Sequence, residues 1–320
     1  MSFYDVFNGD ADGICAVQQW RLANPMESVL VTGVKRDISL LKRVDAKRGD
    51  QVAVFDISLD KNREAASALL AAGADIIYFD HHFPGDIPEH ENFSVQIDTS
   101  AEVCTSLLVN KYLENAFARW AVVGAFGDNL SDSARTLATE IGLSEEEIKQ
   151  FKLLGECINY NGYGATLDDL HITPHALSEE LRGYTDPMDY ILDEAGSYSK
   201  LSAGYQSDLQ QAQSLQPIET DQFVALYALP NEAWARRVSG VFANQLASEN
   251  PERAHAMLTD KSNGNYLVSV RAPLNRKEGA DQLCLQFPTG GGRKAAAGIN
   301  DLPTDQLGGF IEKFREAYSQ

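Results

Sequence analysis

The stretch DIIYFDHH, residues 75–82, joins an apolar run to a carboxylate and two imidazoles. The run Ile76 to Phe79 is short, β-branched and aromatic, which predicts a buried strand. Asp80, His81 and His82 stand where that strand ends, and their oxygen and nitrogen atoms suit manganese, magnesium or zinc. Side chains of adjacent strand residues point to opposite faces, so at most one histidine easily joins a given ion. By itself the tripeptide leaves both a metal site and a surface loop open.

Apolar runs alternate with helical patterns on both sides of this stretch. The runs cover residues 3–7, 28–34, 51–57, 75–79 and 95–97, with helices near 13–22 and from Asp60 onward. Such alternation predicts an α/β fold with a doubly wound parallel sheet. A mainly helical stretch follows over 101–159, in which Ser144 and Glu147 form a capping-box pattern.

The length of the chain predicts two domains, since 320 residues is long for one. Residues 161–216 are polar and broken by Gly and Pro, which indicates a connector with helical pieces. Strand patterns near 222–226, 254–258 and 266–270, with helices near 233–246 and 304–318, predict a second, smaller α/β domain.

The charge of the chain limits its partners. With 46 acidic and 27 basic residues the net charge is -19, which argues against broad capture of duplex DNA or RNA. A short anionic substrate held by one local basic pocket remains compatible with this balance. The four cysteines form no CxxC pair, so neither a zinc knuckle nor a disulfide framework is indicated.

The N-terminus, MSFYDVFNGD, has neither a basic segment nor an apolar segment of the kind that signal peptides carry. No apolar stretch approaches the ~18 residues that a membrane span needs. We therefore expect a cytoplasmic protein without a membrane partner.

Four aspartates recur in similar positions along the first half. Asp10 and Asp12 lie in NGDADG after the first run, Asp56 ends the run VAVFD, and Asp128 follows a helical pattern in GAFGDN. Ligands of open α/β sheets bind outside the carboxyl ends of the strands, where at least three of these groups are expected. Carboxylates brought close repel one another unless cations neutralise them, and two divalent ions would balance four negative charges. Paired ions are a common device for hydrolysing phosphate esters.

The segments FNGDADG, VFDIS, YFDHH and FGDN, in this order, resemble motifs one to four of the DHH phosphoesterases, which include nanoRNases, oligoribonucleases and RecJ-like proteins. SVRAP and TGGGRKAAAG are similar to the DHH-associated C-terminal domain. The resemblance spans nearly the whole chain. It implies a DHH catalytic domain over 1–160, a connector over 161–216, a substrate-binding domain over 217–320, and an active-site cleft between the two domains.

The resemblance also implies roles for individual residues. Asp12, Asp56, His81 and Asp128 match the ligands of one metal, and Asp10 and Asp56 match those of another. Manganese is the usual ion in the family, with Mg²⁺ as the alternative. Asp80 would orient an imidazole, and His82 would face the substrate phosphate and assist catalysis.

Asn8 departs from the family pattern, because many relatives place a His or Asp just before the first motif aspartate as an extra ligand. We therefore expect one ion to bind tightly and the second to bind weakly.

In the second half, Gly290, Gly291, Gly292 and Arg293 form a run that in the family approaches a substrate phosphate, with Arg where His is usual. Arginine preserves anion binding but not proton transfer by that histidine. Arg271, in SVRAP, matches a family position that contacts the substrate phosphate.

Lys35 and Arg36 follow the second apolar run, on the sheet edge that carries the aspartates. They could meet a phosphate, but the sequence favours a solvated surface pair.

The expected function is hydrolysis of phosphate esters by two-metal-assisted attack of water. As a phosphodiesterase, exonuclease or phosphomonoesterase, the chain would act on short oligonucleotides or small phosphorylated nucleotides and not on duplex DNA. A homodimer is compatible with the sequence. Hydrolysis of polyphosphate or pyrophosphate is the alternative within enzymes, and a catalytically weak nucleotide-binding protein is the alternative outside them.

Overall fold

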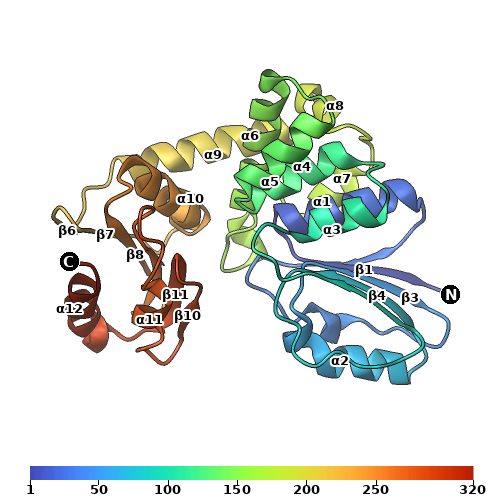
Figure 1. The fold of residues 1–320 in the computed structure, drawn as a ribbon, viewed down its shortest axis with the longest axis horizontal. Coiled ribbons are helices and arrows are strands. Elements are labelled where there is room, and N and C mark those ends of the chain that lie inside the picture. Colours follow the sequence, from blue (N-terminus) through green and yellow to red (C-terminus); the bar gives the residue numbers. More distant parts are fainter. Residues whose placement is uncertain (320) are drawn as a thin grey trace. The chain divides into compact units, whose positions relative to one another are not determined.

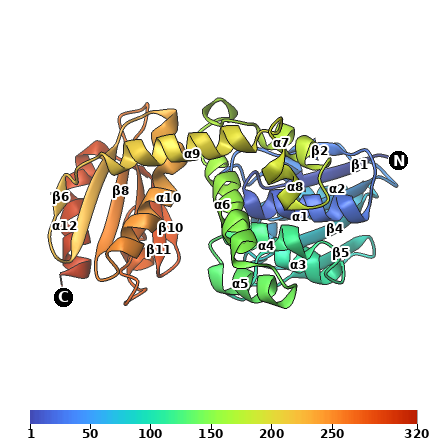
Figure 2. The same ribbon diagram turned by 90° about the horizontal axis from the view of Figure 1, so that it is seen from above.

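The computed structural model describes residues 1–319 of a chain that divides into two compact units, Met1–Gly204 and Tyr205–Gln320 (Figure 1). Each unit has its own sheet and hydrophobic core, and the fold is α/β, which confirms the expected fold class. Helix α9 (Tyr198–Gln213) contains the boundary between the units (Figure 2). Residues 161–204, which the sequence assigns to the connector, belong to the first unit.

The sheet of the first unit consists of strands β1 (Phe3–Phe7), β2 (Val29–Val31), β3 (Gln51–Phe55), β4 (Asp75–Asp80) and β5 (Phe93–Ile97). All neighbours are parallel, in the order β2-β1-β3-β4-β5. Because β1 lies between β2 and β3, the order of the strands reverses there. Such a reversal opens a crevice at the carboxyl ends of the strands. Phe7, Phe55 and Phe79 are register partners, so β1, β3 and β4 end at one level.

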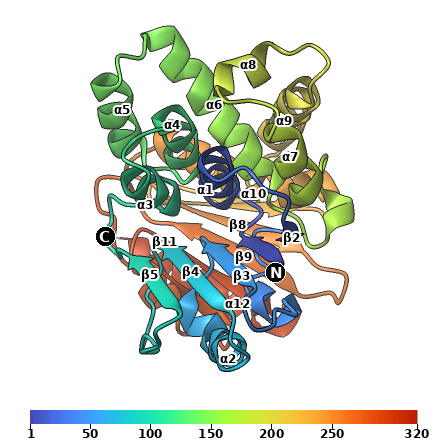
Figure 3. The same ribbon diagram turned by 90° about the vertical axis from the view of Figure 1, so that its right-hand side faces the viewer.

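The helices of the first unit, apart from the start of α9, are α1 (Ala11–Ala23), α2 (Leu59–Ala71), α3 (Thr105–Tyr112), α4 (Ala118–Gly127), α5 (Ser131–Glu140), α6 (Glu145–Asn161), α7 (Pro174–Leu181) and α8 (Pro187–Leu192), with short 3₁₀ turns at Leu40–Arg43 and Leu167–Asp169. Figures 1 and 3 show α2 on one face of the sheet and α1 and α3 on the other. Helix α6 begins at the capping box predicted for Ser144 and Glu147.

The central strands β3 and β4 are buried on both faces over most of their length, which explains why their sequences are continuous apolar runs rather than alternating ones. Val54 and Tyr78 belong to one core cluster, together with Leu70 of α2. On the opposite face the rings of Phe55 and Phe79 stack with centroids 5.6 Å apart.

The second unit contains β6 (Glu219–Thr220), β7 (Val224–Leu229), α10 (Ala233–Glu249), β8 (Ala254–Asp260), β9 (Tyr266–Arg271), α11 (Ala280–Cys284), β10 (Gly290–Gly292), β11 (Ala296–Leu302), a 3₁₀ turn at Thr304–Gln306 and α12 (Leu307–Tyr318). Its strand order is β10-β11-β9-β8-β7-β6, with β7 and β8 parallel and the other neighbours antiparallel. Phe310 and Phe314 of α12 pack into its core with Val268. No helix among residues 1–319 is long and apolar enough to cross a membrane.

The glycine run of the second unit is a strand and not a free turn. Gly290–Gly292 forms β10, which pairs with β11 at the edge of the sheet. Gly290 fits only without a side chain, because a Cβ atom there would lie 1.7 Å from the backbone oxygen of Cys284. A Cβ atom at Gly291 would meet nothing within 4 Å.

Gly290→Ala is therefore expected to destabilise the second unit by about 2 kcal/mol or more, since a backbone atom cannot yield as a flexible side chain can. Gly291→Ala is the matched control, with an expected change of less than about 1 kcal/mol. Urea unfolding of the two variants, followed by circular dichroism, measures the difference. Equal midpoints for both would contradict the close approach of residue 290 to Cys284.

Candidate metal centre

Asp12 lies in the first turn of α1 and is held by the start of α3. Its Oδ2 accepts a hydrogen bond from the backbone N–H of Thr105 and its Oδ1 accepts one from Ser106, each 2.7 Å long. Backbone N–H groups at a helix N-terminus favour a negative charge. The carboxylate is therefore fixed in place, and its remaining lone pairs are available to a cation.

His81 presents one ring nitrogen to the carboxylates. Its Nδ1 lies 3.0 Å from the backbone oxygen of Val103, a partner that only an N–H group can satisfy. The proton is thereby assigned to Nδ1, and Nε2 keeps its lone pair. Nε2 lies 3.4 Å from Asp56 Oδ1, 3.9 Å from Asp128 Oδ2 and 4.0 Å from Asp12 Oδ2.

Asp56 follows β3 in an uncommon conformation. Its φ of 57° is in the left-handed region, which is costly for most residues but tolerated by Asp and Asn. Burial raises the pKa of Asp56 well above its ordinary value, and the charges of Asp10 and Asp12 raise it further. Backbone strain and electrostatic repulsion at one residue are typical of a functional position.

Asp128 follows α4 as its C-cap residue and completes the group. Burial and the charge of Asp12 raise its pKa to about 6. Oxygen and nitrogen atoms of Asp12, His81 and Asp128 lie within 4.8 Å of one another, and so do those of Asp56, His81 and His82. Carboxylates with an imidazole whose Nε2 is free to coordinate are a donor set that fits Mn²⁺ or Mg²⁺. The chain thus brings together four of its five predicted ligands around His81 Nε2.

The fifth predicted ligand, Asp10, is paired with a lysine. Its Oδ2 lies 2.6 Å from Lys35 Nζ, and its Oδ1 accepts a hydrogen bond from the N–H of Gly13 as the N-cap of α1. Burial alone would raise the pKa of Asp10. The Lys35 charge and the hydrogen bonds from Lys35, the N–H of Gly13 and Asp56 together outweigh burial, and the pKa falls below its ordinary value. The favoured interpretation of Lys35 as a solvated residue is wrong, because its side chain is 22% exposed and bonded to this site.

The order of the strands explains why the contact of Lys35 with Asp10 could not be predicted from the sequence. The residue comes after β2, and β2 lies beside β1 in the sheet. The feature of the sequence that pointed to this contact was the position of Lys35 after a predicted strand, on the same sheet edge as the aspartates. The sequence does not say which strand is adjacent to which.

Asp80 contacts the ring of His82 rather than that of His81. Its Oδ1 lies 2.7 Å from His82 Nδ1 and also accepts hydrogen bonds from the backbone N–H groups of both histidines. Asp80 is fully buried, whereas the His82 side chain is 40% exposed. The buried carboxylate therefore orients an imidazole whose other edge is accessible.

The predicted substrate-binding residues gather on neighbouring strands of the second unit. Arg271 ends β9 opposite Ala296 of β11, and its Nε donates to Asn244 Oδ1 at 2.7 Å. Gly290, Gly291 and Gly292 form β10 on the other side of β11. Arg293 is exposed in the hairpin that joins β10 to β11, where its backbone pairs with Ala296.

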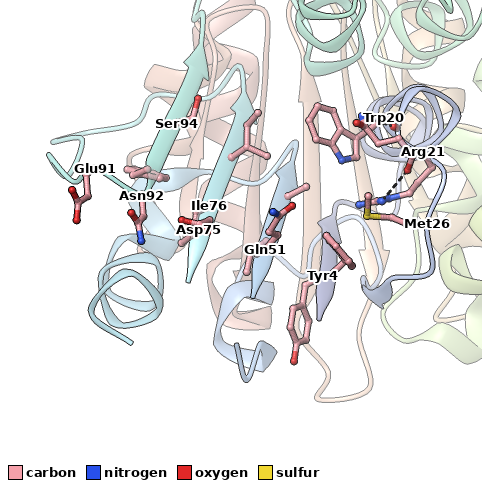
Figure 4. A pocket seen from close by; sticks show the side chains of 16 residues that line it. Tyr4, Trp20, Arg21, Met26, Gln51, Asp75, Ile76, Glu91, Asn92 and Ser94 are labelled. Atoms are coloured by element: carbon pink, nitrogen blue, oxygen red, sulfur yellow. Dashed lines mark hydrogen bonds between the residues drawn. The ribbon is translucent and has the colours of Figure 1, made fainter. Parts of the chain in front are cut away.

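A cavity of about 380 Å³ lies at the other edge of the first sheet (Figure 4). It is lined by residues at the amino ends of the strands, among them Tyr4, Gln51 and Asp75, and by Trp20 of α1. None of the predicted ligands lines it. The chemistry of the first unit is concentrated at the carboxyl edge instead.

Comparison with known proteins gives matches in structure only. No protein-family profile and no curated protein sequence matches the chain. A DHH-domain protein described as a member of a family of ribosomal proteins matches with a TM-score of 0.62 and 14% identity, over 98% of this chain and 86% of the other. The manganese-bound exonuclease RecJ matches with a TM-score of 0.60 and 14% identity, over 100% of this chain and 90% of the RecJ chain.

A third solved structure, the pGpG-specific phosphodiesterase PggH from Vibrio cholerae, matches with a TM-score of 0.56 and 13% identity, over 99% of both chains. At such identities the likeness concerns the fold. The two units, the strand orders and these matches agree on one conclusion. The chain has the RecJ-like fold of the DHH-domain proteins.

Proposed function

We propose that this protein is a metal-dependent phosphoesterase that hydrolyses phosphate esters of short oligonucleotides or small nucleotides. The observation that carries the proposal is the arrangement around His81 Nε2, which has carboxylate oxygens of three aspartates within 4.0 Å. A divalent ion held by Asp12, Asp56, His81 and Asp128 would supply positive charge against the negative charge that develops on the phosphoryl oxygens. The fold of a nuclease and of a dinucleotide phosphodiesterase supports the same chemistry.

Residues of the protein itself position the ligands and supply a proton. The hydrogen bond to Val103 keeps the His81 imidazole in the ligating tautomer, and the start of α3 holds the Asp12 carboxylate in place through two backbone N–H groups. His82, half-exposed beside these ligands, would donate a proton to the leaving oxygen.

The net charge of the chain and its structural similarity to PggH both favour short substrates. The net charge of -19 repels long polyanions, while Arg271 and the exposed Arg293 supply local positive charge for one phosphate or a terminal nucleotide. PggH, named as specific for pGpG, matches the chain from end to end.

A panel assay with Mn²⁺ tests the proposal. The substrates are pGpG and other dinucleotides, 3'-phosphoadenosine phosphate, cyclic dinucleotides, polyphosphate and single-stranded DNA. We expect the linear dinucleotides or the small phosphorylated nucleotide to be hydrolysed fastest. Faster release of phosphate from polyphosphate would favour the alternative enzyme, and no turnover of any substrate would favour a binding protein.

Asp80→Asn is expected to move the alkaline limb of the pH–rate profile to lower pH. Burial lowers the pKa of His82, but its hydrogen bond to Asp80 and the charges of Asp56 and Asp80 outweigh burial and raise it above its ordinary value. A general acid loses activity as pH rises through its pKa, so a raised pKa extends activity upward. Removing the Asp80 charge reverses this extension, while the amide oxygen still accepts the backbone hydrogen bonds.

The comparison variant is His82→Asn, which removes the titrating group and is expected to lower kcat about 10²-fold or more. Initial rates between pH 5 and pH 10 with saturating Mn²⁺ measure both changes. An alkaline limb that stays in place in Asp80→Asn would assign it to a group other than His82.

A further inference from the structure

We propose that the Lys35 ammonium group takes the place of a second metal ion, so that each chain holds one divalent ion and one built-in cation. The divalent ion is bound by Asp12, Asp56, His81 and Asp128, and Lys35 serves Asp10. This inference deepens the proposed function and rests on the same site. It departs from the two-ion scheme expected from the sequence.

The first argument is that both carboxylate oxygens of Asp10 already have partners. Lys35 Nζ lies 2.6 Å from Oδ2, and the N–H of Gly13 donates to Oδ1 at 3.1 Å. Within residues 1–319, neither group of His and carboxylate atoms close enough to share an ion includes Asp10. A second ion between Asp10 and Asp56 would have to displace the ammonium group first.

The second argument is that Lys35 is held in place from several directions. Its Nζ also donates to Asn159 Oδ1 at 2.9 Å and lies 5.1 Å from the centre of the Tyr163 ring. Its backbone N–H donates to the carbonyl of Gly162, and its carbonyl accepts a hydrogen bond from Asn8 Nδ2. A carboxylate, an amide oxygen and an aromatic face around one ammonium group make a built cation site.

The third argument is charge balance. Asp10, Asp12, Asp56 and Asp128 carry four negative charges when ionised. Lys35 and one divalent ion together contribute three positive charges and leave the centre slightly negative. A second divalent ion would leave it positive and would break a largely buried ion pair, which is costly because the Lys35 ammonium group then lacks its partner. Asn8, a buried neutral amide beside the same loop, adds no charge that a second ion could use.

The expected consequence is a mononuclear centre at every Mn²⁺ concentration. Lys35 supplies fixed positive charge at the Asp10 side of the centre, without the coordination positions that a metal ion would offer. Hydrolysis should therefore reach its maximum at one equivalent of bound Mn²⁺.

The test counts ions and does not depend on hydrolysis. Wild type, Lys35→Arg and Lys35→Met are dialysed against saturating Mn²⁺, bound manganese is measured by mass spectrometry, and electron paramagnetic resonance reports whether two Mn²⁺ ions are coupled. We expect one ion and an uncoupled six-line spectrum for wild type and Lys35→Arg. Lys35→Met keeps a side chain of similar length but removes the charge. This variant should bind a second ion and show a coupled spectrum.

Asp10→Asn gives a second test that is independent of the behaviour of Lys35→Met. If Lys35 replaces an ion, removing the Asp10 charge leaves the wild-type count of one unchanged. A two-ion centre would instead lose one of two ions in this variant. Two coupled ions in wild type, or a single ion in Lys35→Met, would overturn the inference.

These outcomes are separable from the proposed function. A chain that binds one ion but hydrolyses nothing in the substrate panel would contradict the function and leave the inference standing. A chain that hydrolyses dinucleotides with two coupled ions would support the proposed function and contradict the inference about Lys35.

Discussion

Asp56→Asn is expected to weaken Mn²⁺ binding about 100-fold or more and to lower kcat/KM about 10³-fold or more. Asp56 Oδ1 lies 3.4 Å from His81 Nε2, nearer than the other carboxylates around that nitrogen. Asparagine keeps the size of the side chain and tolerates the φ of 57°, so the loss is one of charge and not of backbone fit. Calorimetric titration with Mn²⁺ and steady-state kinetics measure the two effects.

The same substitution should stabilise the metal-free protein at neutral pH. An acid whose pKa is raised by folding costs no stability below its ordinary pKa, and stability is lost as pH rises toward the raised value. Burial and the neighbouring charges raise the pKa of Asp56, and burial raises that of Asp128 from 3.8 to about 6. For Asp128 alone the loss between pH 4 and pH 6 is about 2 kcal/mol, and it approaches about 3 kcal/mol above pH 7.

In EDTA we therefore expect wild-type stability to fall as pH rises from 4, and to fall less in Asp56→Asn. Added Mn²⁺ should stabilise wild type and should have little effect on the variant. Asp75→Asn, at the exposed amino end of β4, is the matched control and should change neither property. A metal-free Asp56→Asn variant less stable than wild type at pH 7 would argue against repulsion at this centre.

Arg21→Met is expected to lower the free energy of unfolding of the first unit by about 3–5 kcal/mol. Arg21 donates two hydrogen bonds of 2.6 Å to the carboxylate of Asp5, and both residues are buried. Methionine fills a similar volume but leaves the Asp5 charge without its close partner. The pair joins α1 to β1, so its loss also loosens the helix that carries Asp12. Urea unfolding of the metal-free protein measures the effect.

The control is Arg135→Met, which removes an ion pair with Glu145 whose side chains are 56% and 80% exposed. That change should cost less than about 1 kcal/mol. Combining Arg21→Met with Asp5→Leu should recover part of the loss, because the unpaired charge is then removed as well. A loss in Arg21→Met no larger than in Arg135→Met would show that the buried pair contributes little.

Local sequence patterns predicted the elements that carry the site. Apolar runs identified β1, β3 and β4, and the capping box identified the start of α6, because burial and capping depend on residues close together in the chain. The motif order indicated which carboxylates would meet. The strand Gly290–Gly292 was missed, since three glycines have no side-chain pattern and become a strand only through their pairing with β11.

By itself the sequence determined the fold class, the positions of Asp12, Asp56, His81 and Asp128 at strand or helix ends, and the excess of negative charge. Only the tertiary structure decided which cationic side chain lies against the carboxylates of the site. Adjacency in a sheet is set by long-range pairing, and the pairing of β2 with β1 brings Lys35 to within 2.6 Å of Asp10. It also decided that Asp80 serves His82 and that Val103 fixes His81, because these contacts depend on how loops fold over the ends of the strands.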